Sequence, residues 1–222
     1  MPNETMQAET LKSIIPDQRV VAVIERMQAE RRRPVSGGPR ENPADSHNPY
    51  DYADIGFSIH PEQGDLIYML CRGICAKRVV EFATSVGMST LYFAAAMRDN
   101  GGGTVIGSEL VPAKVATARR NLVEAGLADY AEIREGDARQ TLRDLGGPVD
   151  FALIDGWPLD DGGPSLAFQV IKIVAPQLRV GGYVMNDNAE PDFLDFIRDP
   201  RNGFLSVTLP IKKGTELSVK VA

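Results

Sequence analysis

Short apolar runs alternate along the chain with segments of helical periodicity, and this alternation predicts an α/β fold. Apolar runs rich in β-branched residues predict strands buried on both faces, and apolar residues spaced three or four positions apart predict the helices between them. The predicted strands lie at 79–83, 104–106, 130–134, 149–154 and 183–185, and the predicted helices at 18–33, 58–75, 91–97, 112–125, 165–178 and 193–197. Such alternation favours a mainly parallel sheet with right-handed crossovers and helices on both faces.

Two further apolar runs follow, at 204–209 and 217–221, with Lys213 and Gly214 between them. Runs of this kind joined by a short polar turn predict an antiparallel hairpin. The complete pattern therefore predicts a Rossmann-like, mainly parallel seven-stranded sheet that ends in this hairpin.

The turn after the first predicted strand contains a single glycine. A dinucleotide needs the pattern GxGxxG, because the backbone must come close to a pyrophosphate. Here Ala83 stands at the first glycine position and Gly87 is the glycine that remains. A turn with one glycine and several small hydroxyl residues suits a nucleoside without phosphates, so S-adenosylmethionine fits better than NAD. Ser89 and Thr90 are placed to cap the helix that follows.

Glu109 stands directly after the second predicted strand. Nucleotide-binding folds place a carboxylate about 20 residues after the turn, where it binds the ribose hydroxyls. The alternative is that Glu109 is an ordinary surface acid.

Further oxygen-bearing residues follow the later strands: Asp137, Asp155, Asp187 and Asn188. Ligands of open parallel sheets bind outside the carboxyl ends of the strands, so we expect these side chains near the turn. Two carboxylates brought close together repel one another unless a cation lies between them, and an all-oxygen set suits Mg²⁺ or a similar hard ion. Asp155, Asp187 and Asn188 are therefore a candidate metal site. The alternative is that Asp187 and Asn188 merely cap the next helix.

Composition narrows the class of protein. The 222 residues favour one domain with a sizeable core, and the net charge of −6 gives no basic surface for nucleic acid. No apolar stretch has the length of a membrane span and no signal peptide is evident, so we expect a cytoplasmic protein that binds neither membranes nor nucleic acid. Cys71 and Cys75 are expected to be buried structural thiols.

Residues 34–52 form a long predicted loop with four prolines and two glycines. Loops of this length are uncommon inside a domain and are often lids over a site or else disordered. Both interpretations stay open. We expect residues 1–55 to form an N-terminal helix with this loop, and residues 56–222 to form the cofactor-binding domain.

Six segments, in order, resemble the motifs of one family: SIHPEQGDLIYML, VVEFATSVGMST, VIGSEL, EGDA, VDFALIDG and GGYVMNDN. From about Gly56 to the C-terminus, the chain resembles the catechol O-methyltransferase-like family of S-adenosylmethionine-dependent O-methyltransferases. The resemblance implies a class I methyltransferase fold and methyl transfer from S-adenosylmethionine to a hydroxyl of a small molecule. It also implies a divalent cation such as Mg²⁺, an aromatic acceptor with adjacent hydroxyls, and a homodimer.

The resemblance also implies roles for individual residues. Glu109 would bind the ribose, Glu81 would help to position the amino group of the cofactor, and Asp155, Asp187 and Asn188 would hold the catalytic metal. The cofactor-binding set that it implies is Glu81, Ala83, Thr84, Gly87, Ser89, Glu109, Leu110, Gly136, Asp137, Ala138, Asp155 and Trp157.

Pro158 departs from the family pattern in a way that affects the chemistry. Many members carry a lysine there, three residues after the first metal aspartate, as the base toward the acceptor hydroxyl. Proline cannot accept a proton, so either the metal acidifies the hydroxyl or another group acts, and His47 of the loop is the candidate. Two alternatives stay open: methyl transfer without a metal, and a cofactor-binding protein that has lost catalysis. A dinucleotide oxidoreductase is disfavoured by the missing glycines.

Overall fold

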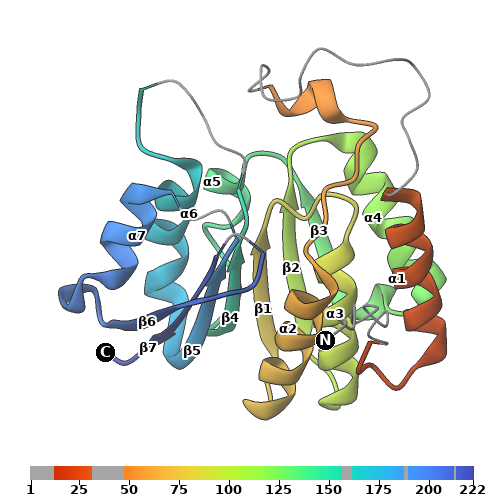
Figure 1. Ribbon diagram of the computed structural model, residues 1–222, viewed down its shortest axis with the longest axis horizontal. Coiled ribbons are helices and arrows are strands. Elements are labelled where there is room, and N and C mark those ends of the chain that lie inside the picture. Colours follow the sequence, from red (N-terminus) through yellow and green to blue (C-terminus); the bar gives the residue numbers. More distant parts are fainter. Residues whose placement is uncertain (1–12, 32–47, 157–161, 188–189, 213) are drawn as a thin grey trace, which may run out of the picture.

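One seven-stranded sheet forms the centre of the molecule (Figure 1). The computed structural model describes residues 13–31, 48–156, 162–187, 190–212 and 214–222. The strand order is β3-β2-β1-β4-β5-β7-β6, with parallel pairing from β3 to β5 and with β7 antiparallel to both of its neighbours. The strands are β1 (Arg78–Phe82), β2 (Thr104–Glu109), β3 (Ala131–Glu135), β4 (Val149–Ile154), β5 (Leu178–Asn186), β6 (Phe204–Leu209) and β7 (Thr215–Lys220). The predicted parallel sheet and terminal hairpin are confirmed.

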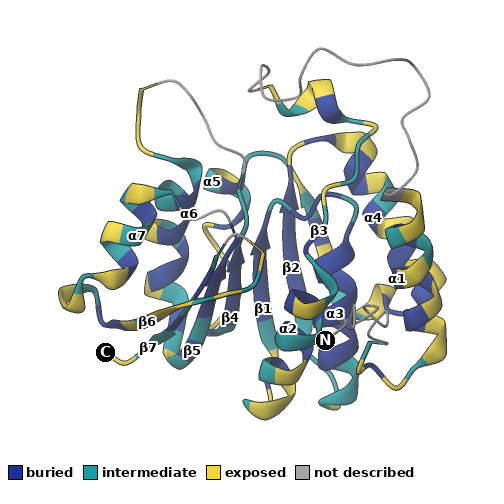
Figure 2. Cartoon of the chain, viewed as in Figure 1, coloured by how far each residue is buried: buried dark blue, intermediate teal, exposed yellow. Residues whose placement is uncertain are grey.

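Helices cover both faces of the sheet and create two apolar cores (Figures 1 and 2). The first core joins one face to α1–α4, and the second joins the other face to α5–α7. The helices are α1 (Gln18–Arg31), α2 (Pro61–Gly73), α3 (Met88–Asp99), α4 (Pro112–Ala125), α5 (Ala138–Thr141), α6 (Leu166–Val174) and α7 (Pro191–Arg198). No helix within the described ranges is both long and apolar enough to cross a membrane.

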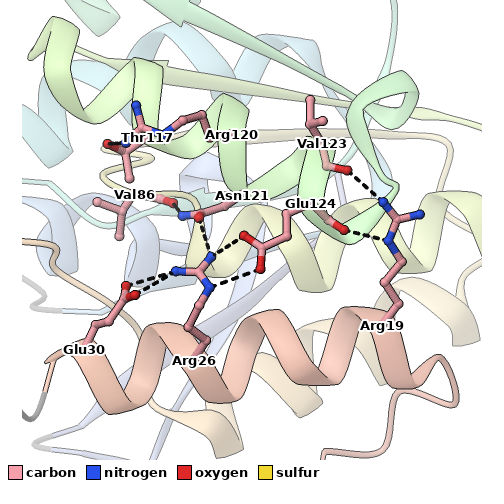
Figure 3. A network of polar contacts seen from close by, with 9 residues as sticks. All are labelled: Arg19, Arg26, Glu30, Val86, Thr117, Arg120, Asn121, Val123 and Glu124. Atoms are coloured by element: carbon pink, nitrogen blue, oxygen red, sulfur yellow. Dashed lines mark hydrogen bonds and ion pairs between the residues drawn. The ribbon is translucent and has the colours of Figure 1, made fainter.

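Helix α1 is fastened to α4 by a polar network around Arg26 (Figure 3). The Arg26 guanidinium donates to both oxygens of Glu124, at 2.8 and 3.2 Å, and at 2.8 Å to the Asn121 side-chain oxygen. Asn121 in turn donates to the Val86 carbonyl at 2.8 Å. Because Val86 lies in the turn after β1, this network connects the N-terminal helix to the predicted cofactor turn. The division of the chain into an N-terminal segment, residues 1–55, and a cofactor-binding domain, residues 56–222, stays a prediction.

Strand β5 begins earlier than its apolar pattern indicates. Gly181 and Gly182 precede the predicted strand at 183–185, but they lie inside β5, where the register with β4 shifts between Val149 and Phe151. Gly181 has a φ of 78°, a backbone conformation that glycine adopts more easily than residues with a side chain. The register shift is a β-bulge, which makes the strand irregular without ending it.

Two other local expectations are wrong in part. Cys71 is fully buried as expected, and burial raises the pKa of its thiol. Cys75 was also expected to be buried, but it is exposed in the turn after α2. Helix α2 begins at Pro61 rather than at residue 58, because proline is favoured in the first turn, where its missing N–H has no helical partner.

We expect replacement of Gly64 by alanine to destabilise the protein by about 2 kcal/mol. A Cβ at Gly64 would overlap the ring of Tyr92, which is 1% exposed in α3 and has no room to move. Gly73, in the last turn of the same helix, would place a Cβ in open space with no neighbouring atom within 4 Å, so Gly73→Ala is the matched control and is expected to be neutral or stabilising. Urea unfolding of both variants tests this, and equal stabilities would contradict it.

Candidate functional site

A cavity of about 670 Å³ opens at the carboxyl ends of the parallel strands. This is the edge at which open α/β sheets bind ligands, and the volume is in the range of sites for small molecules. Most of the lining residues come from the turn after β1, the ends of β2 and β4, the segment after β3, and the hairpin, and others come from residues 57–59, α4 and α6. They include Ala83, Thr84, Ser89, Glu109, Leu110, Gly136, Asp137, Ala138, Asp155 and Lys212. Asp137 and Asp155 therefore lie at this edge together with Glu109, whereas Asp187 is not among the lining residues and Asn188 lies outside the described residues.

Glu109 is held rigidly at the wall of the cavity. It is only 7% exposed, which is unlike an ordinary surface acid. One carboxylate oxygen accepts the backbone N–H of Ser85 at 2.8 Å and the other accepts that of Val111 at 2.8 Å. A carboxylate has about four acceptor positions, so both oxygens retain capacity toward a ligand. The carboxylate is thus preorganised to accept hydrogen bonds from a pair of hydroxyls.

The turn that faces Glu109 has an unusual backbone. Ala83, Ser85 and Gly87 have φ values of 66°, 51° and 87°. Left-handed backbone is strained for residues with a Cβ and is commonly retained at functional sites. Gly87 is the N-cap of α3 and has no side chain to cap the helix. Ala83, Thr84 and Ser85 of this turn line the cavity.

Ser89 and Thr90 do not cap α3 as expected, because their hydroxyls serve Glu81. The Ser89 hydroxyl donates to the Glu81 carboxylate at 2.8 Å, and the Thr90 hydroxyl donates to the other oxygen. Glu81 is fully buried, and this burial raises the pKa of its carboxyl, against the opposing effect of the two hydroxyls. Ser89 lines the cavity. The Glu81 carboxylate therefore orients the hydroxyl of Ser89, which is the residue of this pair at the cavity wall.

Asp137 begins the short helix α5 beside the cavity. Its carboxylate accepts the backbone N–H of Arg139 at 2.8 Å and the Arg139 guanidinium at 2.7 Å. The Arg139 guanidinium holds the pKa of Asp137 below its usual value, so the side chain stays ionised. With Ala138 and Leu110, which also belong to the predicted cofactor-binding set, Asp137 lines the cavity.

The predicted metal site has a different arrangement from the one expected. Asp187 is 1% exposed at the end of β5. One of its oxygens accepts Gln63 Nε2 at 2.8 Å, and the other forms an ion pair with the Lys212 ammonium. Asp155 lines the cavity, while Asn188, Trp157, Pro158 and His47 lie outside the described residues. Among the described residues, no group of three acidic, histidine or cysteine side chains could hold a metal ion.

In the described part of this donor set, Asp187 is therefore not available to a divalent ion as it stands. Both carboxylate oxygens of Asp187 have hydrogen-bond donors, and one of those donors is itself a cation. A metal would have to displace Lys212 from a nearly buried carboxylate.

Sequence reasoning missed three residues of the site. Gln63 and Lys212 contact Asp187 from far along the chain, and no local pattern marks such contacts. Lys114 lines the cavity at 5% exposure, with its Nζ 4.7 Å from the centre of the Phe57 ring. Burial lowers the pKa of Lys114, against the opposing charges of Glu109 and Asp54. The signal that could have found Gln63 is its position three residues after His60, where it closes a helix start by accepting the His60 N–H at 2.8 Å.

Comparison with known sequences identifies a methyltransferase relationship. Residues 80–189 match a family described as a methyltransferase domain. A catechol O-methyltransferase of Niastella koreensis is 35% identical over 102 residues, which cover 44% of this chain and 45% of that protein. A catechol O-methyltransferase of Mycobacterium tuberculosis is 37% identical over 99 residues, which cover 44% of each chain. The matches thus span slightly less than half the length of these curated relatives.

Solved structures extend the similarity in fold to almost the whole chain. An O-methyltransferase of Bacillus cereus in complex with S-adenosylhomocysteine superposes with a TM-score of 0.64 at 21% identity, over 93% of both chains. A methyltransferase of Geobacter sulfurreducens superposes with a TM-score of 0.65 at 21% identity, over 93% of this chain and 90% of that one.

Sheet order, helical layers and a cavity at the carboxyl edge together define a class I methyltransferase fold. Within this fold class, residues 80–189 match the methyltransferase-domain family, and the chain is similar to the two catechol O-methyltransferases over slightly less than half of its length.

Proposed function

We propose that the protein transfers the methyl group of S-adenosylmethionine to a hydroxyl oxygen of a small molecule. The observation that carries this proposal is the Glu109 carboxylate, which lines the cavity and is fixed by the backbone N–H groups of Ser85 and Val111. A ribose diol presents two hydroxyl donors to such an acceptor. Hydrogen bonds to a charged group contribute about 1.5–3 kcal/mol each.

The remaining cavity residues divide between the cofactor and the acceptor. Leu110, Asp137 and Ala138 border the adenine in this proposal, and the turn around Gly87, with Ser89, faces the methionine portion. The acceptor binds at the other end, near Asp155 and Lys212, both of which line the cavity.

The reaction is an in-line displacement that positioning alone can accelerate greatly. The acceptor oxygen forms a bond to the methyl carbon while the carbon–sulfur bond breaks. The electron pair of the carbon–sulfur bond stays on the sulfur and neutralises the sulfonium. The hydroxyl proton leaves to solvent, and S-adenosylhomocysteine and the methyl ether are the products. Asp155 is proposed to orient the acceptor. His47 as the base is a separate prediction.

Two forms of this function are distinguished by their need for a metal. The family resemblance favours Mg²⁺ on Asp155, Asp187 and Asn188, with an aromatic acceptor that carries adjacent hydroxyls. The ion pair between Lys212 and Asp187 favours the second form, in which no metal takes part. The cytoplasmic location, the homodimer, and the exclusion of nucleic acid and membranes stay predictions.

Transfer of labelled methyl groups to a panel of phenols tests the proposal. The panel contains acceptors with single and with adjacent hydroxyls, each assayed with Mg²⁺ and with EDTA. We expect a methylated product and S-adenosylhomocysteine in equal amounts with at least one acceptor. Binding of S-adenosylmethionine without turnover of any acceptor would instead support a protein that has lost catalysis.

A further inference from the structure

Lys212 occupies an unusual position in the connection between β6 and β7. Its backbone φ is 57°, a left-handed conformation that lysine rarely adopts. Strained backbone of this kind persists where the surrounding structure requires it and is concentrated at functional sites. The side chain is 24% exposed, lines the cavity, and forms an ion pair with Asp187, whose side chain is 1% exposed. The hairpin thus carries a positive charge into the acceptor end of the cavity.

Asp187 is compensated by more than this ion pair. Gln63, which is fully buried, donates from Nε2 to Asp187 at 2.8 Å and to the Thr215 hydroxyl at 2.9 Å. Its own side-chain oxygen accepts the His60 N–H at 2.8 Å. These contacts hold the Asp187 carboxylate between α2 and β7. A nearly buried carboxylate must be paired with a cation or hydrogen-bond donors, and removing its partner is strongly destabilising.

We propose that the Lys212 ammonium takes the place of the divalent cation in this protein and binds the acceptor oxygen directly. This inference rests on the proposed methyl transfer. An ammonium has three N–H donors, and one of them is used by Asp187. Because Lys212 lines the cavity, the other donors can reach a ligand there. Lys212 orients the acceptor oxygen by donating a hydrogen bond to it. The oxygen bonds to the methyl carbon, the hydroxyl proton leaves to solvent, and the carbon–sulfur electron pair goes to sulfur.

The proposal has a consequence for the class of acceptor. A hard divalent ion coordinates several oxygens at once and can therefore select two adjacent hydroxyls. An ammonium is a point charge that gives one hydrogen bond to each oxygen, so a single hydroxyl is sufficient. We therefore expect phenols with one hydroxyl to be methylated, with no requirement for a second hydroxyl beside it.

Direct binding of Mn²⁺, followed by electron paramagnetic resonance, tests the exchange of cations without measuring turnover. The wild-type protein is expected to bind no Mn²⁺ at about 1 mM, the range of very weak binding. Lys212→Met removes the ammonium at similar length and is expected to gain Mn²⁺ affinity by at least about tenfold. Lys172→Met removes a lysine that lies over Phe168 and Phe196 instead, and should behave as the wild type. Micromolar Mn²⁺ binding by the wild type that is lost in Asp187→Asn would overturn the proposal.

Two further variants protect the test against misfolding. Lys212→Arg keeps a positive charge and should exclude Mn²⁺. Lys212→Met combined with Asp187→Asn removes both charges, so it should fold and show no gain in Mn²⁺ affinity. If this double variant binds Mn²⁺ as well as Lys212→Met does, the gained site does not involve Asp187 and the proposal is wrong.

Kinetics separate this inference from the proposed function. In EDTA, the wild type should keep its full kcat with a single-hydroxyl phenol, while Lys212→Met should lose at least about 100-fold in kcat and keep its affinity for S-adenosylhomocysteine. Turnover by the wild type that stops in EDTA would refute the role of Lys212 and leave methyl transfer standing. Absence of S-adenosylhomocysteine binding would refute methyl transfer, while the Mn²⁺ measurement would still decide which cation Asp187 binds.

Discussion

Replacing Glu109 with glutamine is expected to weaken the binding of S-adenosylhomocysteine about 100-fold. The carboxylate is fixed by two backbone N–H groups at 2.8 Å and faces the cavity. Two ribose hydroxyls bound to a charged acceptor contribute about 3 kcal/mol together, which corresponds to a factor of about 100. The amide would also turn an NH₂ group toward one of the two backbone donors. Isothermal titration calorimetry measures the change.

Glu135 offers a matched control for this substitution. It pairs in register with Glu109 at the end of the neighbouring strand β3, but it is exposed. Glu135→Gln removes the same charge a short distance away and should change the dissociation constant less than about twofold. If both variants bind S-adenosylhomocysteine equally well, Glu109 does not bind the ribose.

Replacing Glu216 with glutamine is expected to lower the free energy of unfolding by about 3 kcal/mol at pH 7. The carboxylate lies in β7 at 2% exposure and accepts donors from Arg198, Ser206 and Thr208 at 2.7–2.8 Å. The Arg198 guanidinium is the main cause that lowers the pKa of Glu216 from 4.5 to about 2. Each pKa unit corresponds to about 1.4 kcal/mol, so the whole shift in pKa corresponds to a stabilisation of the fold by about 3 kcal/mol when Glu216 is ionised.

The effect has a defined pH dependence. Because the pKa of Glu216 is lowered in the folded protein, its contribution is complete above pH 4.5 and is lost as the pH falls toward about 2. The stability difference between the wild type and Glu216→Gln should therefore shrink over that interval in urea unfolding experiments. Glu132→Gln, which removes an exposed ion pair with Arg134, should cost less than about 1 kcal/mol. A difference that stays constant down to pH 2 would contradict this account.

Much of the fold could be predicted because the relevant signals are local. The apolar strands, the turn with Gly87 and the acidic strand ends all lie within short stretches of sequence, and topology then brings the strand ends to one edge. Glu109 was found in this way. The bulge at Gly181 was missed, because an apolar pattern does not distinguish a glycine turn from an irregular strand.

The contacts that define the acceptor end could not be predicted. Ser89 and Thr90 fit the pattern of helix caps, but a buried carboxylate, Glu81, takes their hydroxyls. Asp187 fits the pattern of a metal ligand, but Lys212 reaches it from the hairpin. In both cases a buried carboxylate must be paired, and this need determines which side chains contact it. Burial arises only when the whole fold is assembled, so it cannot be recognised in a short stretch of sequence.

Titration of the purified wild-type protein with S-adenosylhomocysteine tests the central claim most directly. The account predicts one site per chain with a micromolar dissociation constant, typical of a cofactor that must exchange after each turnover. A folded protein that shows no binding at millimolar ligand would contradict the assignment of the cavity, and with it the proposed methyl transfer.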